Sequence, residues 1–291
     1  MESIGKVGKA FEQKSGERHI NSGSETRVNE MKFIQGDCLE AMKTLPDNSV
    51  DLTVTSPPYD NLRTYNGYVF DFEGIAKELY RVTKDGGVVV WVVGDATIRG
   101  SETGTSFKQA LFFKEIGFNL HDTMIYMREG PPLSHNRYEQ KFEYMFVLSN
   151  GKPSTFNGMV CHSKSAGQKR TSTMRQDSDS LGDRSAKGFV QETKLVGNVF
   201  EYSVGNNCST KDKIAHRHPA IFPEQLAHDH IISWSNEGDT VLDPMMGSGT
   251  TGKMAKILKR NFIGIEISKE YFEIATRRIE NTDPLFQVVG L

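Results

Sequence analysis

The chain has 291 residues, of which 37% are hydrophobic, with 35 Lys and Arg against 37 Asp and Glu and a net charge of −2. This length is sufficient for one large α/β domain with an inserted or appended lobe. The near-neutral charge by itself says nothing about nucleic-acid binding. We expect no signal peptide, and no apolar span is long enough to cross a membrane.

Residues 1–30 are polar and charge-balanced without apolar periodicity, so we expect a mobile or loosely docked tail. From residue 31 onward, strand and helix patterns alternate, which indicates a largely parallel sheet with helices on both faces. The predicted strands are 32–35, 51–55, 87–93, 119–127, 142–149, 240–243 and 262–265. The predicted helices are 39–44, 72–82, 106–116, 223–234, 250–258 and 269–279.

One motif follows the apolar run 51–55 and consists of Ser56, Pro57, Pro58 and Tyr59. The prolines fix φ and lack an N–H group, so this corner is rigid and presents two acceptors, the Ser56 hydroxyl and the Pro57 carbonyl, to a planar amino group. Tyr59 supplies a ring on which a nucleobase can stack. The same tetrapeptide also occurs as an ordinary rigid loop, so alone it leaves both interpretations open.

A second motif reads as a short strand, a glycine-rich turn and a helix over residues 240–251. Gly247 and Gly249 let a ligand approach the backbone, and Glu266 ends the next strand, where it can accept both hydroxyls of a ribose. A phosphate site is disfavoured, because the turn lacks the Gly-Lys-Ser/Thr ending of a P-loop and Asp243 would repel a pyrophosphate. Asp243 can instead bind the cationic amino-acid end of S-adenosylmethionine.

Together the two motifs resemble the amino-methyltransferases of DNA, in the permuted order of their β class, with the acceptor motif first and the cofactor motif last. The resemblance spans most of residues 31–281. Further matches are Gln35-Gly36-Asp37-Cys38, Arg137-Tyr138-Glu139 before Glu143-Tyr144-Met145-Phe146-Val147, and His218-Pro219-Ala220-Ile221-Phe222-Pro223. The resemblance implies a Rossmann-like methyltransferase fold plus a small irregular recognition lobe.

The resemblance also implies roles for matching positions, with S-adenosyl-L-methionine as cofactor. Its catalytic residues are Ser56, Pro57, Pro58 and Tyr59. Its cofactor-binding residues are Asp37, Pro219, Phe222, Asp243, Met245, Gly247, Ser248, Gly249, Thr250 and Glu266. Met245 stands where the family more often has Phe, and a flexible thioether can fill that space. Serine at the first catalytic position favours cytosine N4 as the acceptor, with adenine N6 as the alternative.

The domain organisation follows from the same comparison. Residues 31–150 are expected to form the catalytic half and 216–291 the cofactor-binding half of the methyltransferase domain. Between them, 151–215 is expected to be the target recognition lobe, since 151–217 contain 11 Lys or Arg against 6 Asp or Glu. A solvated loop with scattered charge is the alternative. Candidate DNA contacts are Arg63, Lys164, Lys169, Arg170 and Arg175.

In the expected reaction, acceptors at the corner hold the amino hydrogens and aim the nitrogen lone pair for direct in-line methyl transfer. The base would be flipped out of the duplex. No covalent intermediate is needed, and Cys38, Cys161 and Cys208 are expected to be structural or incidental. No metal is expected, because the histidines at 216, 218, 228 and 230 have no cysteine pairs at zinc spacing.

The expected partner is double-stranded DNA, for a cytoplasmic protein of prokaryotic or phage origin that is a monomer or homodimer. The sequence leaves open whether a cognate restriction endonuclease acts separately. An inactive DNA-binding protein and an RNA or protein methyltransferase are the remote alternatives. The usual motif order of the latter enzymes, with the cofactor turn first, is the reverse of the order found here.

Overall fold

The computed structural model describes residues 29–59, 70–128, 137–169, 188–205 and 208–283. Within these residues an eight-stranded sheet has the order β1-β12-β11-β2-β3-β7-β6-β10. Its strands are β1 (Met31–Gln35), β2 (Val50–Thr55), β3 (Thr83–Val93), β6 (Asn119–Met127), β7 (Phe142–Ser149), β10 (Val199–Glu201), β11 (Thr240–Asp243) and β12 (Asn261–Glu266).

The first five strands in this order, from β1 to β3, are all parallel to their neighbours in this set. β7 is antiparallel to both β3 and β6, and β10 pairs in parallel with β6. The apolar run 88–93 in β3 lies at the centre and is buried along its whole length, as expected for a strand covered on both faces. The predicted largely parallel sheet is therefore confirmed.

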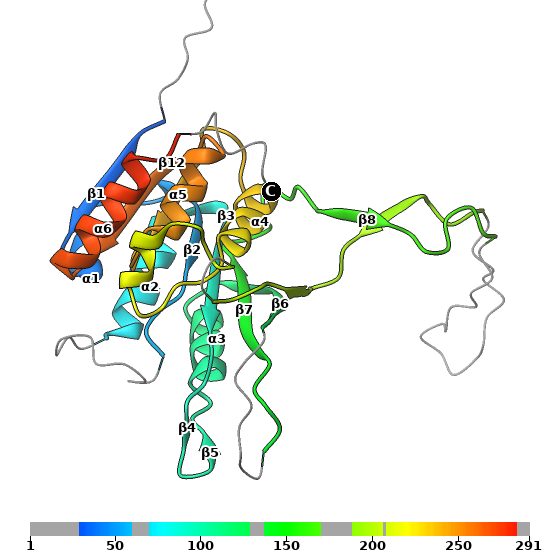
Figure 1. The fold of residues 1–291 in the computed structure, drawn as a ribbon, viewed down its shortest axis with the longest axis horizontal. Coiled ribbons are helices and arrows are strands. Elements are labelled where there is room, and N and C mark those ends of the chain that lie inside the picture. Colours follow the sequence, from blue (N-terminus) through cyan, green and yellow to red (C-terminus); the bar gives the residue numbers. More distant parts are fainter. Residues whose placement is uncertain (1–28, 60–69, 129–136, 170–187, 206–207, 284–291) are drawn as a thin grey trace, which may run out of the picture.

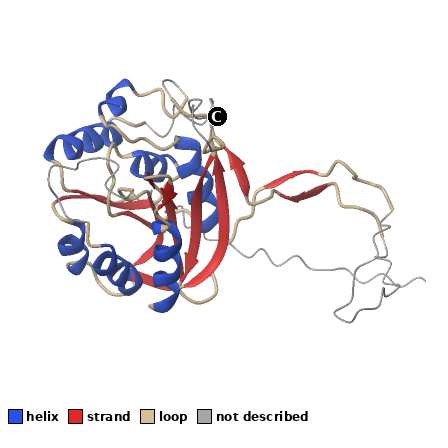
Figure 2. Ribbon diagram, turned by 90° about the horizontal axis from the view of Figure 1, so that it is seen from below, coloured by secondary structure: helices blue, strands red, loops and turns tan. Residues whose placement is uncertain are grey.

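Helices cover both faces of the sheet (Figures 1 and 2). One face packs against α4 (Glu224–Trp234), α5 (Thr250–Ile257) and α6 (Lys269–Glu280). The other packs against α1 (Cys38–Lys43), α2 (Phe72–Val82) and α3 (Thr105–Glu115). Side chains cap several of these helices: Asp37 accepts from the first turn of α1, Asp71 from that of α2 and Ser268 from that of α6.

Two projections leave this body. A hairpin of β4 (Thr97–Ile98) and β5 (Ser101–Glu102) follows β3, and Arg137 binds it through Gly100 O at 2.5 Å and Glu102 at 3.3 Å. An arm, formed by residues 158–169 and 188–197, extends from the β6–β10 edge of the sheet (Figures 1 and 2). Its base is a ribbon of β8 (Val160–His162) and β9 (Thr193–Leu195).

The residues that flank the arm bind the body through their backbone: Asn157 N donates to Ser233 O, and Ile125 N donates to Asn198 O, each at 2.8 Å. The range predicted as an irregular recognition lobe is thus partly regular, and its residues 199–201 extend the main sheet as β10. A short 3-10 helix (Lys213–Arg217) follows. The predicted tail of residues 1–30 lies almost wholly outside the described residues. In the described part of the chain, no helix has the length and apolarity needed to cross a bilayer.

Candidate active site

The carboxyl ends of β1, β12, β11, β2 and β3 form one edge of the sheet, here called the carboxyl edge. Because these strands are parallel and adjacent, the residues that follow them come together there. Asp37, Glu266, Asp243 and Ser56 follow or end successive strands in that order. The edge therefore brings the two sequence motifs side by side, although they lie far apart in the chain.

Asp243 connects the two motifs directly. Its side chain is 1% exposed, and its Oδ1 accepts a hydrogen bond from Thr55 Oγ1 at 2.8 Å and one from Met245 N at 3.2 Å. Thr55 immediately precedes Ser56, so the glycine turn and the catalytic corner are held together. Burial raises the pKa of Asp243 to about 6, against the opposing effect of these hydrogen bonds.

Glu266 is fixed by backbone amides on both of its carboxylate oxygens. Oε2 accepts from Gly247 N and Oε1 from Ser268 N, each at 2.9 Å. Burial raises the pKa of Glu266 despite these hydrogen bonds. The carboxylate is thus oriented against the glycine turn, and each oxygen keeps a lone pair with which it can accept a ligand hydroxyl.

Asp37 lies on the neighbouring strand end, because Gly36 N donates to Glu266 O at 3.0 Å. Its Oδ1 caps α1 through Leu39 N and Glu40 N. Its side chain is exposed, so the carboxylate reaches the surface of the carboxyl edge. Burial, with the nearby Asp37 charge, raises the pKa of the Cys38 thiol to about 12. This cysteine therefore stays protonated at neutral pH and is a poor nucleophile.

The two glycines of the turn have different neighbours. Both adopt positive φ, 51° for Gly247 and 81° for Gly249, which favours glycine. A Cβ on Gly247 would lie 3.1 Å from His218 Nε2, which places the His218–Pro223 stretch against the turn. A Cβ on Gly249 would meet Ala275 of α6 at 3.0 Å. Gly249 therefore also allows close packing of α6 against the turn, and its contact with the cofactor stays a prediction.

The side chains of Ser248 and Thr250 also point into the protein. Arg278 Nη1 donates to Ser248 O at 3.0 Å and Thr250 Oγ1 at 3.1 Å, and its distance to Ser248 Oγ is 3.3 Å. Both residues are buried. Ser248 and Thr250 stay predicted cofactor contacts, and in the structure their hydroxyls link the turn to α6 through Arg278.

The remaining cofactor candidates line the same edge. Met245 is half-buried and packs against the core on the α1 side of the sheet, while Phe222 packs on the α4 side. Pro219 is exposed beside His218, whose ring meets Tyr271 edge-on at 4.3 Å between centroids. Among the described residues, no group of three or more His, Cys, Asp or Glu side chains is arranged to hold a metal ion.

At the catalytic corner, Ser56 contacts Tyr59, and Tyr59 contacts a residue, Glu143, for which the sequence predicted no role. Ser56 Oγ lies 2.9 Å from the Tyr59 hydroxyl, which in turn donates to Glu143 Oε2 at 2.9 Å. Glu143 Oε1 forms an ion pair with Arg128 Nε, also at 2.9 Å. The expected stacking ring of Tyr59 therefore also has an anchored hydroxyl. In the sequence, only the match of residues 143–147 to the family pattern pointed to a role for Glu143.

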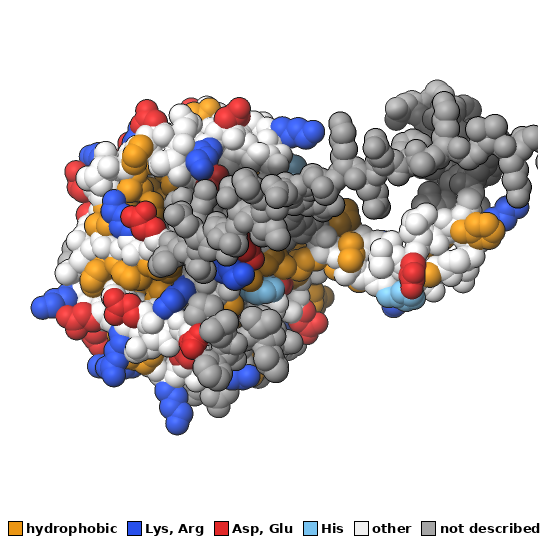
Figure 3. All heavy atoms as spheres, turned by 90° about the horizontal axis from the view of Figure 1, so that it is seen from above, with side chains coloured by type: hydrophobic (Ala, Val, Ile, Leu, Met, Phe, Trp, Pro, Cys, Tyr) orange, Lys and Arg blue, Asp and Glu red, His pale blue; other side chains and the backbone are white. Residues whose placement is uncertain are grey.

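The arm carries the described candidates for DNA contact. Lys164 and Lys169 are exposed there, and Lys169 forms an isolated bridge with Phe189. Apolar side chains also reach its surface, including Val160, Phe189 and Leu195 (Figure 3). Arg63, Arg170 and Arg175 lie outside the described residues.

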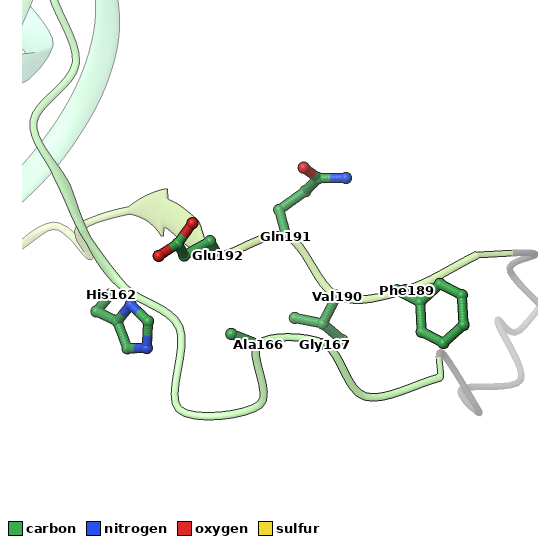
Figure 4. A pocket seen from close by; sticks show the side chains of 7 residues that line it. All are labelled: His162, Ala166, Gly167, Phe189, Val190, Gln191 and Glu192. Carbon is green, nitrogen blue, oxygen red and sulfur yellow. The ribbon is translucent and has the colours of Figure 1, made fainter.

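Two hollows in the described part of the chain lie away from the carboxyl edge. One is a shallow depression on the arm, bordered by residues such as His162, Phe189 and Glu192 (Figure 4). The other lies at the base of the arm and is lined by residues that include Trp234 of α4 and Phe200 of β10. Neither is lined by residues of the two motifs, so the candidate site is defined by the strand ends.

Comparison with known proteins identifies the family. Residues 50–277 match the N6/N4 methyltransferase model, described as a DNA methylase. The orphan methyltransferase M.BamHII of Bacillus amyloliquefaciens is 56% identical over 244 residues, which cover 82% of this chain and 92% of that protein.

Two solved structures show the same fold. The PvuII DNA methyltransferase, named cytosine-N4-specific, is 19% identical, with a TM-score of 0.63 over 89% of this chain and 90% of its own. The M1.HpyAVI complex with SAM is 24% identical, with a TM-score of 0.54 over 85% of this chain and 99% of its own. By sequence, the chain belongs to the N4/N6 amino-methyltransferase family of DNA methylases, which are S-adenosyl-L-methionine-dependent enzymes.

Proposed function

We propose that this DNA methyltransferase transfers a methyl group to the exocyclic N4 of cytosine in double-stranded DNA. The observation that carries the base assignment is Ser56, a neutral hydroxyl in the position where adenine enzymes commonly have Asp or Asn. Adenine N6 is the second candidate, because both bases present an amino group of the same chemistry.

The residues of the carboxyl edge fit S-adenosyl-L-methionine. Asp37, Asp243 and Glu266 offer carboxylates on neighbouring strand ends, which suits a ligand with two cationic centres and a ribose. Met245 adds an apolar, adaptable surface. In this proposal Glu266 accepts the ribose hydroxyls and Asp243 attracts the cationic amino-acid end. When bound, the cofactor supplies an electrophilic methyl group.

The catalytic corner activates a weak nucleophile. An exocyclic amine has its lone pair delocalised into the ring, and acceptors that hold its hydrogens favour pyramidal nitrogen. Ser56 Oγ and the Pro57 carbonyl are the proposed acceptors, and the ring of Tyr59 supports the flipped base. Transfer forms the N–CH3 bond as the S–CH3 bond breaks, and the nitrogen then loses one proton to solvent.

The deciding experiment identifies the product. The protein is incubated with unmethylated genomic DNA and labelled S-adenosylmethionine, and the DNA is digested to nucleosides for mass spectrometry. N4-methylcytosine is the expected product. N6-methyladenine would keep the site and its chemistry but overturn the base assignment. Absence of label in DNA, with cofactor binding shown by calorimetry, would overturn the proposed activity.

Recognition of the DNA sequence is proposed for the arm. It projects from the sheet edge, and the range 151–217 to which it belongs has a local charge of +5, from 11 basic and 6 acidic residues. A basic projection on an otherwise acidic body is suited to the phosphate backbone. The relative from Bacillus amyloliquefaciens is named an orphan methyltransferase, which favours action of this chain without a dedicated endonuclease.

A further inference from the structure

A chain of hydrogen bonds runs from the catalytic corner to the start of β7. It begins at Ser56 Oγ, passes through the Tyr59 hydroxyl at 2.9 Å and ends on Glu143 Oε2 at 2.9 Å. Arg128, directly after β6, forms an ion pair with the other carboxylate oxygen, with 2.9 Å between its Nε and Glu143 Oε1. The chain therefore connects the end of β2 with the adjoining ends of β6 and β7, across a separation of 84 residues between Tyr59 and Glu143.

The direction of each hydrogen bond in this chain follows from the groups involved. A carboxylate paired with arginine only accepts, so the Tyr59 hydroxyl must donate to Glu143. A phenol has one proton, and it is then used. The bond between Ser56 and Tyr59 can form only if Ser56 is the donor, which leaves the Ser56 oxygen with lone pairs alone for any further partner.

We propose that Glu143 is a positioning residue that acts through Tyr59 to keep the Ser56 hydroxyl turned as an acceptor toward the amino group of the target base. The amino group is a donor, so a serine free to rotate would present its own O–H to it in part of the molecules. This inference rests on the proposed binding of an exocyclic amine at Ser56, and it applies equally to cytosine N4 and adenine N6.

The surroundings of Tyr59 support a fixed hydroxyl. Burial, together with the Glu143 charge, raises the pKa of Tyr59 well above its usual value, so the phenol keeps its proton at neutral pH. Its ring lies against the backbone after β3, where a Cβ on Gly94 would come within 3.6 Å of it. Tyr59 therefore keeps both its phenol proton and the ring position that the hydrogen bonds to Ser56 and Glu143 require.

The test measures methyl transfer for Glu143→Gln and Tyr59→Phe on unmethylated genomic DNA. Glu143→Gln replaces a carboxylate that only accepts hydrogen bonds by an amide that can also donate. Tyr59→Phe removes the hydroxyl that joins Ser56 to Glu143. Each is expected to lower kcat about 10-fold, as for the loss of one directed hydrogen bond, with KM for the cofactor unchanged. The matched control is Glu78→Gln, since Glu78 pairs with Arg81 and its side chain is 18% exposed, close to the 16% of Glu143. The control should keep wild-type kcat.

A double-mutant cycle distinguishes this role from a purely structural one. If Glu143 acts through Ser56, Glu143→Gln should lower kcat less than 2-fold further in a Ser56→Ala background. An equal loss in both backgrounds, or normal kcat in Glu143→Gln, would overturn the inference. If Glu143→Gln does not fold by thermal melting, the same cycle is run with Tyr59→Phe. Normal transfer by Ser56→Ala alone would instead refute the proposed site itself, and the inference with it.

Discussion

Among single residues, Ser56 is the one on which the proposed chemistry depends most. Ser56→Ala removes an acceptor for the amino hydrogens without disturbing the Thr55–Asp243 hydrogen bond that precedes it. We expect kcat to fall about 10²- to 10³-fold, as when one preorganised polar group is lost from an active site. Methyl transfer measures the loss, and calorimetry should show unchanged cofactor affinity.

The control for this change is Ser49→Ala. Ser49 also carries a hydroxyl near β2, but it donates to Pro46 O at the opposite end of that strand. Its removal should leave transfer at the wild-type rate. A Ser56→Ala protein that matched this control in kcat would show that the corner does not bind the acceptor.

The titration of Asp243 should change cofactor affinity and folding stability in opposite directions. Its pKa is about 6 in the folded protein, against about 3.9 for an unfolded aspartate. The ionised form attracts a cationic ligand, so cofactor affinity should fall as the pH is lowered through about 6. Protonation favours the folded state, so its contribution to stability is complete below about pH 3.9 and is lost as the pH rises through 6.

Asp243→Asn should abolish both effects, leaving weaker cofactor binding that no longer falls as the pH is lowered through about 6. Calorimetric titration on both sides of that pH measures the affinity, and urea unfolding measures the stability. Asp47→Asn, at an exposed carboxylate that pairs with Arg81, serves as the control. A wild-type pH profile in Asp243→Asn would mean that another group governs cofactor binding.

At the level of elements, an ionic network of two buried cations and two partly exposed carboxylates links the helices of the cofactor half. Arg278 of α6 and Lys253 of α5 both bind Asp212 and Glu224, at 2.5 to 2.8 Å. Burial opposes ionisation of Asp212, but hydrogen bonds from the two cations outweigh it and lower its pKa. The network also includes Thr210, which receives a hydrogen bond from Arg278 at 3.1 Å.

Removing Arg278 should therefore be costly. Its side chain is 1% exposed, and Arg278→Met leaves two carboxylates with a single cation. We expect a loss of about 3–5 kcal/mol in the free energy of unfolding, measured with urea. Arg277→Met is the control, because the neighbouring arginine on the same helix is exposed. Equal stability of the two variants would contradict a structural role for the network.

The long and the short elements differ in how well the local sequence predicts their bounds. Long strands and helices such as β6 and α2 have the predicted bounds, because their apolar periodicity reflects burial. Strands of two or three residues, such as β8 and β10, carry no period and depend on distant partners. The same holds for the site: adjacency in the sheet brings Asp243 to Thr55, and the Tyr59–Glu143 bond is a long-range contact with no local signal.

For the whole molecule, the arm and the body are expected to have separable roles. The arm contacts the body at its base, and β8 and β9 are adjacent at His162 and Thr193. Joining these two residues by a short Gly-Ser turn removes the distal arm while keeping the ribbon. We expect unchanged thermal stability and cofactor binding but loss of DNA methylation. Retained methylation of specific sites would show that recognition lies elsewhere.

The exposed lysines of the arm allow a second test of whether DNA contacts the arm rather than the body. If Lys164 and Lys169 each neutralise one phosphate, the double change to Ala should make the plot of log K for DNA binding against log salt concentration less steep. The magnitude of its slope should fall by about 1.8. Fluorescence anisotropy with duplex DNA over a range of salt concentrations measures this slope. The control replaces Lys259 and Lys269, which are 65% and 77% exposed on the body. An equal change in slope for both pairs would mean that DNA contacts the body as much as the arm, whereas a change confined to Lys164 and Lys169 places the phosphate backbone along the arm.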